Sequence, residues 1–147
     1  MPGGICQVKK LSRIMDYEEE IYKLSLPPAV MIHGLGQARL ALRLGRPVTL
    51  LSAAGAASNW GCSWWGSLLA AAAHNGPALL DCGAAPGRAV EALALGLRGI
   101  VLAPCPTWAE VAALARQNQA LLLAAPPEAL DLGQKQRESA LIAWLSG

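Results

Sequence analysis

The sequence predicts an α/β domain with a mostly parallel sheet. Four short apolar segments recur along the chain, at 48–52, 78–82, 99–103 and 120–124. Stretches with helical periodicity separate them, which is typical of βαβ units. Apolar runs without polar alternation indicate strands covered on both faces. We therefore expect a small three-layer αβα domain of flavodoxin-like or Rossmann-like type, with a four-stranded sheet in the order 2-1-3-4. A (βα)4 half-barrel is the alternative.

The predicted helices follow from their stop and start signals. A helix over 35–44 ends at Gly45 with Pro47 just beyond, and Ser63 is in place to cap a helix over 64–73. Thr107 and Glu110 have the spacing of a capping box, which predicts a helix from there to Gln117. Two further helices are predicted over 88–95 and 134–145, and 53–61 is predicted as a loop of small residues.

The first 25 residues differ from the rest in charge. Ile14, Tyr17, Ile21 and Leu24 recur at helical spacing before Pro27–Pro28 stops the helix. We expect residues 1–25 to form a charged helical arm or a leader, and residues 26–147 to form a single α/β domain. Such an arm either packs on its own domain or contacts a partner or a second copy.

Composition excludes several classes of protein. The chain has 147 residues, of which 54% are apolar and 15% charged, so it has the apolar surface that disordered proteins lack. The net charge of +2 comes without a basic stripe, which argues against nucleic-acid binding. Residues 47–80 carry no charge, but proline, glycine and asparagine interrupt them, and we expect no membrane span.

The cysteine pattern predicts a reduced, cytoplasmic protein. Cys6, Cys62, Cys82 and Cys105 match no Cys-x-x-Cys pattern, and no secretory leader is expected. The last three could converge at one edge of the sheet as ligands of zinc or as nucleophiles. Because no histidine is placed to activate one, we interpret them as small packed side chains and predict no metal.

A ligand site is predicted at the carboxyl edge of the sheet, where ligands of parallel sheets bind. The loops that follow three of the predicted strands contain small and hydrogen-bonding residues and lead into helix amino ends, which favour anions. We expect a small anionic or nucleotide-like ligand there. The candidate residues are Ser52, Gly55, Ser58, Asp81, Cys82, Gly83, Gly87, Arg88, Cys105 and Thr107.

One of these loops resembles a known motif. Asp81-Cys82-Gly83-Ala84-Ala85-Pro86-Gly87 is similar to the first glycine-rich motif of S-adenosylmethionine-dependent methyltransferases, especially its Asp-x-Gly-Ala-Ala-Pro-Gly form in RNA methyltransferases. The resemblance implies that residues 81–87 line the methionine half of that cofactor. The next predicted strand ends in Ala103-Pro104, where the family has an acid that holds the ribose.

The reaction stays open, because no Ser-His-Asp or paired-carboxylate spacing is visible. The first hypothesis is a ligand-binding module; a non-enzymatic oligomeric interaction module and an S-adenosylmethionine-binding fragment are the alternatives. Trp60, Trp64 and Trp65 either stack a planar ligand or form core or subunit contacts. Since the chain is short and apolar, a homo-oligomer is expected.

Overall fold

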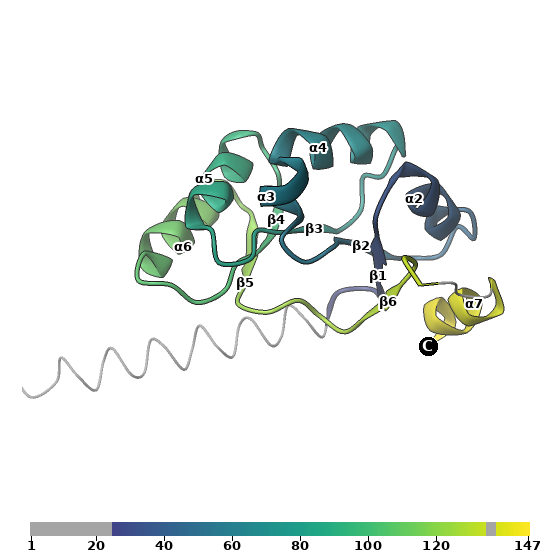
Figure 1. Cartoon of the computed structure of the whole chain (residues 1–147). Helices are drawn as coiled ribbons and strands as arrows, with labels where there is room; N and C mark the ends of the chain where they lie inside the picture. Colours follow the sequence, from purple (N-terminus) through teal and green to yellow (C-terminus); the bar gives the residue numbers. More distant parts are fainter. Residues whose placement is uncertain (1–24, 135–137) are drawn as a thin grey trace, which may run out of the picture.

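The computed structural model describes residues 25–134 and 138–147 and shows an α/β fold around one six-stranded sheet (Figure 1). The strand order is β5-β4-β3-β2-β1-β6, and every neighbouring pair is parallel. The predicted class and the parallel sheet are therefore confirmed. The strands are β1 (Ala29–Ile32), β2 (Thr49–Ser52), β3 (Ala78–Asp81), β4 (Gly99–Val101), β5 (Leu121–Leu123) and β6 (Ala129–Asp131).

The expected number and order of strands were wrong. The four predicted strands are β2 to β5, whereas β1 and β6 were missed. Both missed strands follow a pair of prolines, Pro27–Pro28 and Pro126–Pro127, and each has only three or four residues. Each therefore resembles the end of a loop in sequence. β1 pairs with β2 on one side and with β6 on the other. These pairings stabilise two strands that their own composition does not indicate.

Five of the described helices correspond to predicted ones, with bounds that differ by up to two residues at the ends that the structure describes, and α3 was not predicted. The described helices are α2 (Leu35–Leu42), α3 (Ala56–Trp60), α4 (Cys62–Ala71), α5 (Pro86–Ala94), α6 (Trp108–Gln117) and α7 (Glu138–Ser146). The predicted loop over 53–61 contains α3, and Gly61, at φ +92°, separates it from α4. Two predicted caps were wrong: Ser63 lies inside α4, and Thr107 makes no side-chain cap hydrogen bond.

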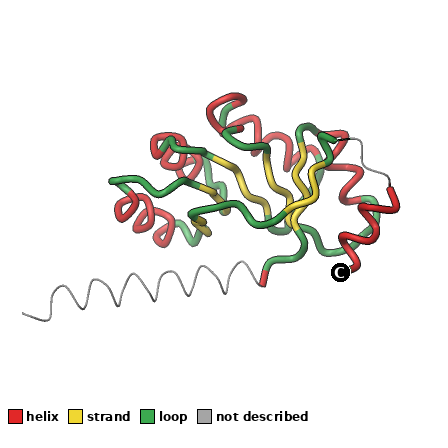
Figure 2. Tube along the Cα trace, turned by 60° about the horizontal axis from the view of Figure 1, so that its bottom comes forward, coloured by secondary structure: helices red, strands yellow, loops and turns green. Residues whose placement is uncertain are grey.

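The two faces of the sheet are covered differently. Val30, Leu50 and Leu80 belong to a buried cluster that includes the inner faces of the described helices, among them Leu141 and Leu145 of α7. The opposite face carries a smaller cluster, formed by Leu51, Leu79, Val101 and Leu123 and flanked by Leu26, Met31, Leu121 and Ala129. Since no described helix contributes to this second cluster, the described part of the chain has two layers instead of the expected three (Figure 2).

The sheet order explains this one-sided arrangement. Strands β1 to β5 are adjacent in chain order, so each right-handed crossover places its helix on the same face. This consecutive order is the one that the half-barrel alternative requires. The connection 124–128 then crosses to the far edge, where β6 pairs with β1, and it passes on the side away from α4 (Figure 1). The indole N–H of Trp144 in α7 donates to the Ala29 carbonyl at 2.7 Å, which holds α7, the helix after β6, to β1.

The arm predicted for residues 1–25 lies outside the described residues, apart from Ser25. The start of the last predicted helix, at 135–137, lies outside them as well. Among the helices that the structure describes, none has both the length and the apolar character needed to cross a bilayer.

Gly99 should be hard to replace. A Cβ there would overlap the backbone carbonyl oxygen of Ala78 on the neighbouring strand. We expect Gly99→Ala to lower the free energy of unfolding by about 1–3 kcal/mol, because the two strands must separate to admit the methyl group. Gly66→Ala is the matched control, since its Cβ would meet Leu97 at an ordinary 3.7 Å and alanine favours a helix interior. Urea denaturation of both variants measures the difference, and equal stabilities would contradict the packing argument.

Candidate functional site

The ends of β2 and β3 are joined by buried polar groups. The backbone N–H of Asp81 donates to Ser52 Oγ at 2.8 Å, and that hydroxyl donates to the Ala53 carbonyl at 3.2 Å. Ser52 is fully buried and Asp81 is 7% exposed. Ser52 therefore ties the two strand ends together and is not available to a ligand.

The carboxylate of Asp81 fixes the two loops that follow these strands. Its Oδ1 accepts the N–H of Gly55 at 3.2 Å and the N–H of Gly83 at 2.7 Å. Both glycines have left-handed φ values, +68° and +58°, and a Cβ on Gly83 would lie 3.7 Å from the Gly55 Cα. The structure thus brings together Ser52, Gly55, Asp81 and Gly83 of the predicted site. Asp81 positions backbone here, so the loop that resembles the methyltransferase motif already uses its carboxylate oxygen.

The remaining candidate residues are exposed or make contacts of their own. Ser58, Gly87 and Thr107 are exposed, and Arg88 forms an ion pair with Glu91 at 2.8 Å. Cys105 Sγ lies 3.6 Å from Thr107 Oγ1. These residues lie on loops and helices that begin at the carboxyl edge. The backbone N–H of Ser58 donates to the Gly55 carbonyl at 3.1 Å, but in the described chain none of their side chains forms a hydrogen bond with Ser52, Gly55, Asp81 or Gly83.

The two buried cysteines are packed as neutral thiols. Burial, together with smaller contributions from the neighbouring Cys62 and Asp81, raises the pKa of Cys82 to about 12. Burial and the Glu91 carboxylate also raise the pKa of Cys62, which Arg88 offsets only in part. Cys62 donates its S–H to the Arg88 carbonyl at 3.3 Å. Both thiols stay protonated at neutral pH and are poor nucleophiles. Among residues 25–134 and 138–147, no three metal-binding side chains gather.

A histidine and an aspartate that were not predicted as site residues meet at the same edge. His33 directly follows β1 and Asp131 ends β6, so the parallel pairing of these strands brings them together. His33 Nε2 donates to Asp131 Oδ1 at 2.7 Å, and that oxygen also accepts the Gly133 N–H at 2.8 Å. The backbone N–H of His33 is held by Gln37 Oε1 at 2.7 Å.

A short repeat in the sequence gives the signal that would have located Asp131. Leu80-Asp81-Cys82-Gly83 and Leu130-Asp131-Leu132-Gly133 share the pattern Leu-Asp-x-Gly. In both, the aspartate ends a strand and accepts the N–H of the glycine two residues later. The pairing of Asp131 with His33, 98 residues away, was invisible to sequence reasoning because neither β1 nor β6 was predicted.

The amino end of α2 lies beside His33. Its N-cap is Gly34, no side chain caps it, and its first turn contains no acidic residue. Among the described residues, no acceptor is found for the N–H groups of Leu35 and Gly36. Gly36 is exposed, and a Cβ there would meet nothing within 4 Å. Free amides at a helix amino end favour an anion.

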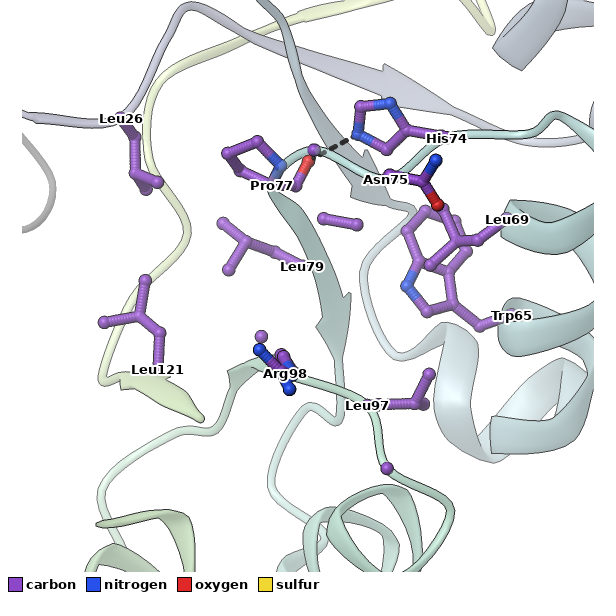
Figure 3. Close-up of a pocket in the computed structure, with 14 residues that line it drawn as sticks. Leu26, Trp65, Leu69, His74, Asn75, Pro77, Leu79, Leu97, Arg98 and Leu121 are labelled. Atoms are coloured by element: carbon purple, nitrogen blue, oxygen red, sulfur yellow. Dashed lines mark hydrogen bonds between the residues drawn. The ribbon is translucent and has the colours of Figure 1, made fainter. Parts of the chain in front are cut away.

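A depression of about 540 Å³ lies at the opposite edge, by the amino ends of β3 and β4 (Figure 3). Its walls are mainly apolar, and His74 closes one side by donating from Nε2 to the Pro77 carbonyl at 2.9 Å. Arg98 contributes a guanidinium to its lining. None of the predicted ligand-binding residues lines it, so this depression is separate from the carboxyl edge.

Comparison with known proteins identifies no relative. No protein-family model, no curated protein and no solved structure matches the chain. Function is therefore inferred from the geometry of the site.

The pairing of His33 with Asp131 predicts an acid-dependent contribution to stability. Partial burial raises the pKa of Asp131, but the hydrogen bonds from His33 and Gly133 and the charge of His33 outweigh it and leave this pKa below 3.8. A lowered pKa in the folded state stabilises the fold above the ordinary pKa, and this contribution is lost as the pH falls through the lowered value. We expect Asp131→Asn to be less stable than the original chain at neutral pH, with the gap closing as the pH falls through the lowered pKa of Asp131.

Urea denaturation at several pH values measures this gap. Glu138→Gln, which removes an exposed carboxylate from α7, is the control and should show no comparable narrowing. A gap between Asp131→Asn and the original chain that is constant with pH would contradict the assigned role of the carboxylate.

Proposed function

We propose that this chain is a ligand-binding α/β module that holds a small anionic or nucleotide-like molecule at the carboxyl edge of its sheet. The observation that carries the proposal is the amino end of α2, which has free N–H groups, no side-chain cap and no acidic residue in its first turn. A phosphate or carboxylate supplies the acceptors and the negative charge that such a terminus favours.

The rest of the edge supports the same location. The fixed Gly55 and Gly83 loops give a rigid wall, because Asp81 holds both of their amides. The negative charge of Asp81 disfavours an anion directly against these loops. The anionic group is therefore best placed toward α2, and the remainder of the ligand extends past Asp81 toward the exposed Gly87 at the start of α5.

Thermal unfolding in the presence of inorganic phosphate or adenosine diphosphate tests the proposal. A ligand present at about 100 times its Kd stabilises the folded state by about 2.7 kcal/mol, which raises the midpoint by several degrees. Gly36→Glu should abolish this shift, because its carboxylate competes for the helix amino end. Gly36→Ala is the matched control and should keep the shift, since it changes the same position without adding charge.

Chloride at equal ionic strength separates specific binding from salt effects. The proposal is wrong if neither probe raises the midpoint of the original chain, or if Gly36→Glu responds as strongly as Gly36→Ala.

A second candidate function, self-association, is favoured by one surface feature. Trp60 at the end of α3 is 66% exposed, and its ring centroid lies 6.0 Å from that of Trp64. Exposed tryptophans are enriched at protein interfaces, where they contribute large apolar contact areas.

We expect Trp60→Ser to shift an oligomer toward the monomer in native mass spectrometry, because it removes the most exposed large apolar side chain of the described residues. Ser58→Ala changes an exposed residue of the same helix and should leave the mass distribution unchanged. A purely monomeric original chain, or an oligomer that Trp60→Ser does not weaken, would remove this candidate.

A further inference from the structure

The His33–Asp131 pair has the arrangement of an oriented base. The two side chains are 39% and 33% exposed, so both are accessible from solvent. An ionised carboxylate only accepts hydrogen bonds, so the proton of the shared bond is on Nε2 of His33. In its neutral form the ring then presents a lone pair at Nδ1, and no described residue donates to that atom.

Three contacts fix the ring and its partner. Asp131 Oδ1 is itself held by the Gly133 N–H at 2.8 Å, and Gln37 Oε1 holds the His33 backbone N–H at 2.7 Å. Gly133 also packs against the imidazole so closely that a Cβ at this position would overlap the ring. The orientation of Nδ1 is therefore set by the fold before any ligand arrives.

The other Leu-Asp-x-Gly segment, residues 80–83, shows by comparison what distinguishes the His33–Asp131 pair. Asp81 is buried and its second donor is the backbone N–H of Gly55, so it can only position a loop. Asp131 has the same turn but accepts from an ionisable ring that solvent reaches. The same turn therefore places an aspartate that binds two backbone N–H groups at the end of β3 and an aspartate that binds an imidazole at the end of β6.

We propose that His33 is a general base at the carboxyl edge, with Asp131 as its positioning residue, and that the ligand carries a proton which His33 removes. The location of the ligand rests on the proposed function. In the step, the proton moves from the ligand to Nδ1 and the electron pair stays on the ligand. The Asp131 carboxylate balances the charge of the resulting imidazolium, which later returns its proton to water.

Elimination of 5-nitrobenzisoxazole by the full chain tests the base directly. Nδ1 takes the ring C–H proton, the C–H electron pair forms the nitrile, and the N–O bond breaks to release a coloured phenolate. We expect His33→Gln to lower the protein-dependent rate by about 100-fold. His74→Gln is the matched control and should keep the rate, because His74 bonds only a neutral carbonyl.

Two further variants test the positioning role. Asp131→Asn and Gly133→Ala leave His33 present but remove or displace its partner, and each should lower the rate by about tenfold or more. Nitrogen-15 NMR of the two histidines supplies a readout that simple destabilisation would not change: His33 should be in the Nε2–H form in the original chain and should lose this preference in Gly133→Ala.

The outcomes separate the two proposals, because the probe is uncharged and needs no anion site. Elimination that depends on His33, together with no response to phosphate, supports the base and removes the anion site. A rate that His33→Gln leaves unchanged in a folded variant, or an Nδ1–H form of His33, overturns the base whatever phosphate does.

Discussion

The consecutive parallel pairing of β1 to β5 is the constraint on which the rest of the molecule depends. Because each strand lies beside its predecessor, every crossover helix falls on one face and every strand ends at the same edge. That edge therefore receives the amino ends of α2, α3, α5 and α6 together with the residues that terminate the strands. Asp81 ends β3 and His33 directly follows β1, so both lie at this edge. The return of the chain to β6 then adds Asp131 beside β1.

Two aspartates at this edge show how burial decides the role of a side chain. Asp81 lies among strands β2, β3 and β4, where its carboxylate accepts backbone amides and its exposure is 7%. Asp131 lies on β6, the edge strand of the sheet, and no other strand of the described residues pairs beyond it. A carboxylate on an edge strand stays accessible to solvent and to an ionisable partner. The pairing of β1 with β6 brings His33 within hydrogen-bond distance of Asp131.

The parts of the fold that the sequence predicted are those with strong local signals. Strands β2 to β5 are apolar runs bounded by glycine or proline, and α5 and α6 have one apolar face each, so their existence follows from periodicity. The Asp81 loops were located for the same reason, since small residues follow two clear strands. Strands β1 and β6 are short and depend on each other, and such non-local pairing leaves little trace in local composition.

The same dependence explains why the sequence indicated only some of the polar groups that meet at the carboxyl edge. Ser52, Gly55, Asp81 and Gly83 belong to strand ends that local patterns define, whereas His33 acquires its partner only when the chain crosses the whole sheet. The capping box failed for a different, local reason: the Thr107 hydroxyl lies 3.6 Å from Cys105 Sγ and makes no cap bond to the amides of α6. The hydroxyl leaves those amides without a side-chain acceptor, as Gly34 does for α2. Helix amino ends that lack such caps stabilise these helices less, and they leave N–H groups without a side-chain acceptor at the carboxyl edge.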